Sequence, residues 1–220
     1  MSADKGAVAE LLAALSYGER LAQQRADASV ALAPDARARS QQERVAGREA
    51  ENLSLLEARL GELSGPGLQE RFRPFFDAFF EATHPRDWVE AQAFHYVGDA
   101  LVADFAEVLL PALDPVTAQV VRTSLCERDE QDAFALDQVT AALADDDGAR
   151  ERVAAYVRRV AGEALTQTRR ALDASDAVGA LLGGEEGEKR VLLDLLDRHR
   201  RRLDRLGIEP VDHEPDDPDE

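Results

Sequence analysis

The chain has 220 residues, which is enough for one domain with a substantial core, and its Ala-, Leu- and Arg-rich composition with only 5% aromatic residues favours helices over sheet. Its single cysteine, Cys126, excludes an intrachain disulfide, and without a leader or an apolar run of about 18 residues we expect a soluble, cytoplasmic protein with no membrane partner. The net charge of −18, from 44 acidic and 26 basic residues, disfavours nucleic-acid binding unless basic side chains gather locally.

The first part of the chain predicts two long helices. Apolar residues recur in steps of three and four over about residues 4–32 and again over about residues 36–63. Three polar residues occupy positions in these apolar stripes: Glu19 in the first, and Glu49 and Asn52 in the second. We therefore expect these three side chains to point into the protein interior.

A phenylalanine-rich segment follows the turn at residues 64–67. Residues 68–82 hold five of the eight phenylalanines at helical spacing, namely Phe72, Phe75, Phe76, Phe79 and Phe80. We interpret this segment as a crossover helix. Its aromatic side chains are expected to form a lid or end cap rather than to line a substrate pocket, because phenylalanines at helical spacing are usually core residues.

Two further helices complete a predicted four-helix bundle. One runs from about residue 85 to residue 110, with Asp87 as its N-cap, and it places His95 and Asp99 on one face. The other begins at Asp114-Pro115 and extends to about residue 143. Its inward stripe is predicted to contain Val116, Val120, Ser124, Glu127, Gln131 and Phe134.

The rest of the chain predicts two more amphipathic helices, at about residues 149–182 and 186–206, and then a tail. We interpret the arginine run Arg200–Arg202 as a solvated face, and the six carboxylates of Val211–Glu220 as part of a disordered acidic tail. The predicted fold class is all-α: an antiparallel four-helix bundle with a crossover segment and two additional C-terminal helices. The helical domain covers residues 1–207, with the core bundle at about 4–145, accessory helices at about 149–206 and the tail at 208–220.

An internal repeat points to a polar centre in this bundle. Tyr17-Gly18-Glu19 is echoed by Val97-Gly98-Asp99, and each motif is followed about 30 residues later by two polar residues three apart, Glu49 with Asn52 and Arg128 with Gln131. Residues three apart share one face of a helix, so two such helix pairs aim six polar side chains at one point. Carboxylates placed in this way can ligate two metal ions.

The register of the last bundle helix leaves two alternatives open. Either Arg128 and Gln131 face inward and a guanidinium, paired with Asp99 or Glu19, stands in for the metal, or Glu127 and Glu130 face inward and keep an all-carboxylate site. His95, one turn before Asp99, could add an imidazole. The candidate metal ligands are Glu19, Glu49, Asn52, Asp99, Glu127, Glu130 and Gln131.

Short motifs spread over about residues 7–207 carry a resemblance to known proteins. They are Tyr17-Gly18-Glu19-Arg20, Asp87-Trp88-Val89-Glu90, Tyr96 to Leu101 with Asp104-Phe105, Gly162-Glu163-Ala164-Leu165, and His199 to Arg202 with Leu206-Gly207. The chain resembles the ferritin-like superfamily, and within it an actinobacterial family described as similar to the tRNA-(2-methylthio-isopentenyladenosine) hydroxylases. The resemblance implies a ferritin-like bundle and a diiron monooxygenase that hydroxylates a modified tRNA adenosine.

The sequence departs from the metal-binding pattern of that superfamily, which uses a Glu from each of two helices and a Glu-x-x-His from each of the other two. Here Glu49-Ala50-Glu51-Asn52 has an amide in place of the histidine, and the last bundle helix has no histidine in either register. One expectation is an enzyme that holds two iron ions, or manganese, and acts on tRNA or a small molecule. The other is a non-catalytic bundle that has lost its metals and serves as a binding or dimerisation module, for example as a homodimer.

Overall fold

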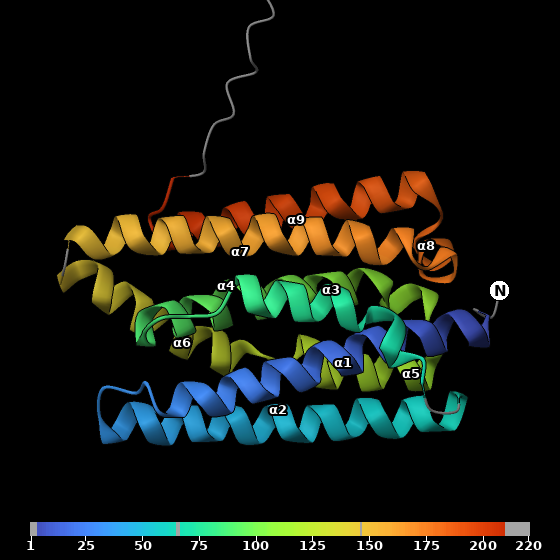
Figure 1. The fold of residues 1–220 in the computed structure, drawn as a ribbon, viewed down its shortest axis with the longest axis horizontal. Coiled ribbons are helices and arrows are strands. Elements are labelled where there is room, and N and C mark those ends of the chain that lie inside the picture. Colours follow the sequence, from blue (N-terminus) through green and yellow to red (C-terminus); the bar gives the residue numbers. More distant parts are fainter. Residues whose placement is uncertain (1–3, 65–66, 146, 210–220) are drawn as a thin grey trace, which may run out of the picture.

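The computed structural model describes residues 4–64, 67–145 and 147–209, and within these ranges it contains helices and turns but no strand. The helices run side by side along the long axis of the molecule (Figure 1). Their order is α1 (Lys5–Val30), α2 (Ala36–Leu63), α3 (Gln69–Ala82), α4 (Trp88–Leu109), the 3-10 turn η1 (Leu110–Ala112), α5 (Pro115–Val121), the π-helical turn η2 (Arg122–Cys126), α6 (Asp129–Asp145), α7 (Asp147–Asp173), α8 (Asp176–Leu182) and α9 (Glu185–Arg205).

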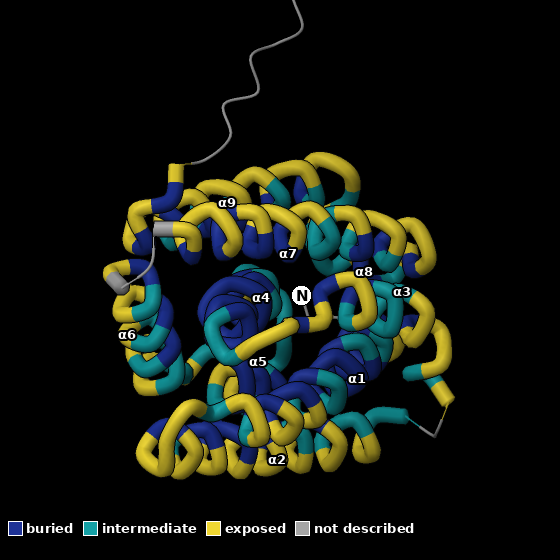
Figure 2. Tube along the Cα trace, turned by 60° about the vertical axis from the view of Figure 1, so that its left-hand side comes forward, coloured by how far each residue is buried: buried dark blue, intermediate teal, exposed yellow. Residues whose placement is uncertain are grey.

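Helix α4 lies at the centre of the molecule, with α1, α2, α6, α7 and α9 arranged around it (Figure 2). It begins after Asp87, whose side chain accepts a hydrogen bond from the Glu90 N–H at 2.9 Å. Every residue from Glu90 to Asp104 except Val102 is buried. A helix that is buried on all sides needs neighbours on all sides, and α4 therefore fixes the positions of the helices that pack on it.

Helices α1 and α2 form an antiparallel pair beside α4, as the two apolar stripes predict. Small side chains bring them close together, with Ala26, Val45 and Ala46 forming a buried cluster. The three polar residues in the stripes, Glu19, Glu49 and Asn52, are buried as expected.

The single helix predicted for residues 114–143 is wrong, because the π-helical turn η2 and residues 127–128 divide it into α5 and α6. The Glu127 N–H donates to the Arg122 carbonyl, five residues back, at 3.2 Å. Such a turn inserts one extra residue and rotates all later side chains. The predicted inward stripe holds only in part. Ser124 is buried, but Glu127, directly after the turn, is exposed. Before the turn, Val116 is 58% exposed, whereas Thr117 and Val121 are buried.

The C-terminal helices form part of the hydrophobic core and are not accessory additions to its surface. Val153, Tyr156 and Val157 of α7 belong to the same buried cluster as Phe94 and Val97 of α4. The predicted helix 149–182 is interrupted before Ser175, which caps α8 by accepting a hydrogen bond from the Val178 N–H at 3.2 Å.

The arginine run on α9 is only partly the solvated face that we predicted. Arg202 donates two hydrogen bonds to the carboxylate of Asp104 on α4, one of them 2.9 Å long, and Arg198 lies 3.4 Å from the same carboxylate. Ile208 packs in the core, so the tail begins at least one residue later than predicted. The other predicted tail residues from 210 to 220 lie outside the described part of the chain. None of the described helices combines the length and apolar character needed to cross a bilayer.

Candidate functional site

Four segments bring charged side chains together in the middle of the bundle. Glu19 of α1, Glu49 of α2, Asp99 of α4 and Arg128, which directly precedes α6, line one cavity of about 20 Å³. The three carboxylate residues are only 5%, 4% and 8% exposed. A cavity of this size accommodates one or two water molecules and no organic substrate.

Arg128 supplies the positive charge of this polar core. Its Nε donates to Asp132 at 2.8 Å, its Nη2 donates to the His95 carbonyl at 2.9 Å, and the same Nη2 lies 3.8 Å from Asp99. Burial opposes the charged form, but the carboxylates of Asp132, Asp99 and Glu49 outweigh it and raise the pKa of Arg128 above its ordinary value. The guanidinium is therefore a permanent cation in the core.

The surroundings of Glu19 favour its protonated form. Burial, followed by the charge and hydrogen bond of Glu49 and the charge of Asp99, raises the pKa of Glu19 well above its ordinary value. Glu49 accepts from the amides of Asn52, at 3.4 Å, and Gln131, at 3.3 Å. The raised pKa favours the neutral acid at Glu19, beside a Glu49 carboxylate group that accepts from two amides.

His95 is held at both ring nitrogens. The amide nitrogen of Gln42 donates to the Ala26 carbonyl at 3.1 Å and approaches His95 Nε2 at 3.2 Å. An amide nitrogen only donates, so Nε2 accepts and the proton of the neutral ring is on Nδ1, which donates to Asp99 at 2.8 Å. His95 thus orients Asp99 and has no free nitrogen for a metal.

The structure places the predicted site residues in two groups. Glu19, Glu49, Asn52 and Asp99 are buried, and half-buried Gln131 reaches them through its bond to Glu49, so five of the seven meet. Glu127 and Glu130 are exposed. Of the two registers left open by the sequence, the structure has the one in which Arg128 faces inward.

This set of side chains does not fit a ferritin-type dimetal centre. Amides occupy both histidine positions, a guanidinium occupies one carboxylate position, and the raised pKa of Glu19 favours a neutral acid where a ligand would be ionised. Among the described residues, no three His, Cys, Asp or Glu side chains are grouped closely enough to hold a metal ion.

The two repeat glycines have a packing role beside the polar core. A Cβ on Gly18 would lie 2.6 Å from the Phe76 ring, and a Cβ on Gly98 would lie 2.9 Å from the Phe94 ring. Both distances are too short for a real contact, so only glycine lets these rings approach the helix backbones.

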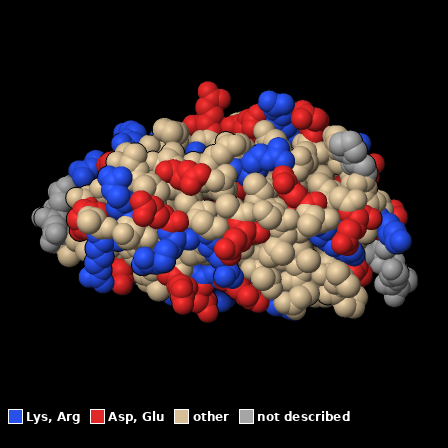
Figure 3. Space-filling view, turned by 90° about the horizontal axis from the view of Figure 1, so that it is seen from below, with Lys and Arg blue, Asp and Glu red and all other residues tan. Residues whose placement is uncertain are grey.

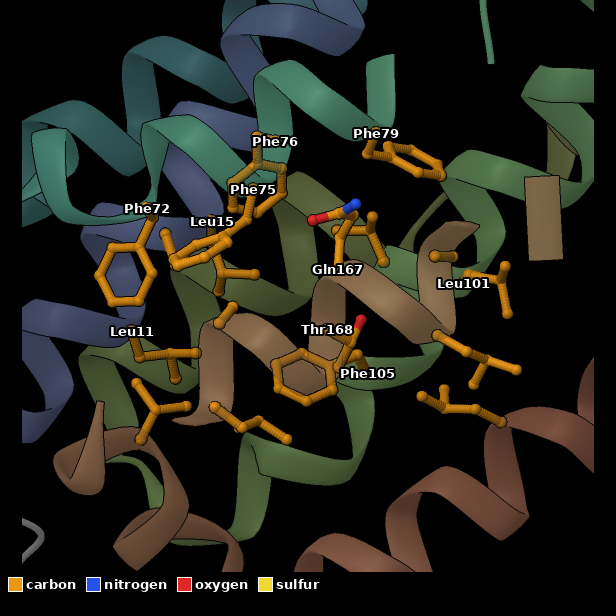
Figure 4. A pocket seen from close by; sticks show the side chains of 18 of the residues that line it. Leu11, Leu15, Phe72, Phe75, Phe76, Phe79, Leu101, Phe105, Gln167 and Thr168 are labelled. Carbon is orange, nitrogen blue, oxygen red and sulfur yellow. The ribbon is translucent and has the colours of Figure 1, made fainter. Parts of the chain in front are cut away.

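A second cavity, of about 110 Å³, lies beside the polar core and has an almost entirely apolar lining (Figure 4). Four of the five phenylalanines of residues 68–82 line it: Phe72, Phe75, Phe76 and Phe79. These side chains therefore border a cavity as well as packing in the core, and their predicted role as a lid rather than as the wall of a substrate pocket stays a prediction. Phe79, Gly98 and Val102 border both cavities, so the two are adjacent.

Sequence reasoning missed two members of the polar core. Gln42 is fully buried and accepts from the Gln92 amide at 2.9 Å, and Asp132 pairs with Arg128. The inward position of Gln42 could have been predicted from the sequence, because Gln42 falls four residues after Ala38 and three before Val45 in the apolar stripe of α2. The position of Asp132 could not have been predicted, because its orientation depends on the π-helical turn.

Comparison with known proteins places these features in a family. A family model described as "Ferritin-like domain, actinomycetes" matches residues 3–185, which include all helices from α1 to α8. No curated protein matches the chain. The match agrees with the all-α bundle and with the predicted ferritin-like fold.

Proposed function

The chain belongs to the family of ferritin-like domains of actinomycetes, and from that premise we propose that it is a non-catalytic binding protein in which an arginine replaces the dimetal centre. The observation that carries this proposal is the guanidinium of Arg128, which lies in the carboxylate cluster with its Nη2 3.8 Å from Asp99. A cation supplied by the protein removes the electrostatic need for metal ions at that point.

The energetics of buried charge support this proposal. A carboxylate buried without a partner costs several kcal/mol, and a metal ion is one way to offset that cost. Here Asp99 has Arg128 and His95, while Glu49 accepts from two amides and lies beside Glu19, whose raised pKa favours the neutral acid. Asp99 and Glu49 thus have partners without a metal.

One face of the molecule shows no continuous basic surface for tRNA (Figure 3). Lysine and arginine are interspersed with aspartate and glutamate on the face shown in Figure 3, which is seen from below the view of Figure 1. A large polyanion needs a continuous basic surface to overcome a net charge of −18. The adjacent apolar cavity favours a small uncharged molecule instead.

The alternative function is a diiron hydroxylase, as the resemblance of the sequence implies. One observation favours it: Glu19 Oε1 is buried and has no hydrogen-bond partner among the described residues. If two iron or manganese ions were held here, this oxygen would be a ligand. The metal content of the purified protein distinguishes the two functions.

We expect the protein, expressed in iron-supplemented medium, to contain close to no iron or manganese per chain by elemental analysis. A variant that restores the ferritin ligand pattern, Asn52→His with Arg128→Glu and Gln131→His, should gain metal, because it removes the cation and supplies two imidazoles. A stoichiometry near two metal ions in the wild-type protein would overturn the proposal.

A further inference from the structure

We infer that the apolar cavity bounded by α1, α3, α4, α7, α8 and α9 is a binding site for an uncharged small organic molecule that has a compact hydrocarbon part and one hydrogen-bonding group. This inference rests on the proposed binding function and deepens it by naming the class of ligand. Metal content and ligand binding are measured separately, so either proposal can fail alone.

The size of the cavity is the first argument. Natural cores are packed as densely as organic crystals and contain few voids larger than a water molecule. A void of about 110 Å³ is comparable to engineered cavities of about 150 Å³ that stay dry and bind benzene. The cavity is partly open to the surface, and a hydrocarbon part of about one aromatic ring fits within it.

The lining of the cavity is the second argument. Apolar side chains from all six bounding helices form most of its wall, and none of the described residues that line it is charged. Without a cation in the wall, a carboxylate or phosphate would lose its hydration and would gain no ion pair that offsets this cost. The site therefore selects against anionic ligands.

Two polar side chains of α7 also line the cavity, Gln167 and Thr168 (Figure 4). Gln167 is 8% exposed and is anchored by its amide nitrogen, which donates to Glu163 at 3.4 Å. An amide and a hydroxyl offer both a donor and an acceptor, which matches an alcohol or a carbonyl compound. The few polar groups in an apolar site determine the orientation of its ligand.

Three probes that share one ring test this selectivity: benzyl alcohol, toluene and benzoate. We expect benzyl alcohol to bind more tightly than toluene, and benzoate not to bind, in ligand-detected NMR titrations and in thermal unfolding with each probe. Binding to the folded state alone raises the unfolding temperature with ligand concentration. Benzoate binding as tight as that of benzyl alcohol, or no binding of either neutral probe at its solubility limit, would overturn the inference.

Two variants test the location. Ala171→Leu adds carbon atoms at a lining position of α7 and should remove binding, whereas Ala155→Leu, the same change at an exposed position of α7, should leave it unchanged. Gln167→Leu should weaken benzyl alcohol binding about three- to tenfold and leave toluene binding unchanged or stronger, because it removes one hydrogen-bonding group. Circular dichroism checks that each variant folds. Equal binding by the wild-type protein and Ala171→Leu would place the ligand elsewhere and contradict the inference.

Discussion

At the scale of single residues, the charge on Arg128 sets the energetics of the polar core. Its side chain is 12% exposed and lies among Asp99, Asp132 and Glu49. Removing one partner of a buried ion pair leaves the other uncompensated, which costs about 3–5 kcal/mol. We expect Arg128→Leu to lower the free energy of unfolding by that amount in urea titrations.

The matched control for this prediction is Arg122→Leu, which removes an arginine from the neighbouring turn at an exposed position. It should change stability by no more than about 0.5 kcal/mol. A similarly small loss for Arg128→Leu would show that the guanidinium does not compensate the buried carboxylates.

The proton on Glu19 makes stability depend on pH. Its pKa is raised in the folded protein, so above the ordinary value of 4.5 the folded state binds more protons than the unfolded chain, and stability falls as pH rises toward the folded pKa. Each tenfold difference in proton affinity corresponds to about 1.4 kcal/mol. Glu19→Gln mimics the protonated acid and removes this dependence.

We therefore expect Glu19→Gln to match the wild-type stability near pH 4.5 and to exceed it by about 1 kcal/mol or more at pH 8, measured by urea unfolding across that range. Glu51→Gln, at an exposed position two residues from Glu49, is the control and should follow the wild-type curve. A Glu19→Gln variant that is less stable than the wild type at pH 8 would contradict the assignment of the proton to Glu19.

Most inward positions of the polar core could be predicted from the sequence. Glu19, Glu49 and Asn52 interrupt regular apolar stripes, and a stripe fixes which way a helical side chain points. The role of Asp99 as a hydrogen-bond acceptor of His95 follows from their spacing of four residues. The raised pKa of Glu19 could not be predicted, because it depends on the distances between side chains of different helices.

At the scale of helices, the π-helical turn η2 decides which residues of the last bundle helix face the core. The extra residue turns Arg128 inward and leaves Glu127 and Glu130 exposed. No local sequence rule marks such a turn, because contacts between distant parts of the chain, those of η2 and α6 with α4, stabilise it. The choice between the two registers therefore needed the structure.

The attachment of α9 to α4 is a second property of whole helices. Asp104 of α4 is 5% exposed and binds Arg202 and Arg198 of α9. We expect Arg202→Ala to destabilise the protein by about 3 kcal/mol, because Arg198 at 3.4 Å compensates the buried carboxylate only in part. It should also speed proteolytic cleavage within α9, followed by mass spectrometry.

Arg201→Ala separates this contact from general effects of losing a charge on α9. Arg201 is exposed and pairs with Asp197 of its own helix, and such surface pairs contribute about 0–1 kcal/mol. If Arg201→Ala and Arg202→Ala had equal effects on stability and cleavage, the bond to Asp104 would not hold α9 in place.

At the scale of the whole molecule, the central position of α4 makes the C-terminal helices necessary for folding. The sequence identifies them as amphipathic additions to a four-helix bundle, but it does not show which helix they cover. In the structure, Val153, Tyr156 and Val157 pack against Phe94 and Val97, and the Tyr156 hydroxyl donates to the Thr83 carbonyl at 2.8 Å. Without α7, this face of the central helix would meet water.

We expect a chain that ends at residue 145 not to fold, whereas a chain that ends at residue 209 should fold like the full protein. Exposing one buried Val, Leu or Phe costs about 1.5–3 kcal/mol, so exposing several exceeds the total stability of about 5–15 kcal/mol of a typical domain. Circular dichroism and thermal unfolding should show helicity and a cooperative transition for residues 1–209 and neither for residues 1–145. A cooperative transition in the shorter chain would mean that α1 to α6 form an independent bundle, and that α4 does not depend on α7 for its burial.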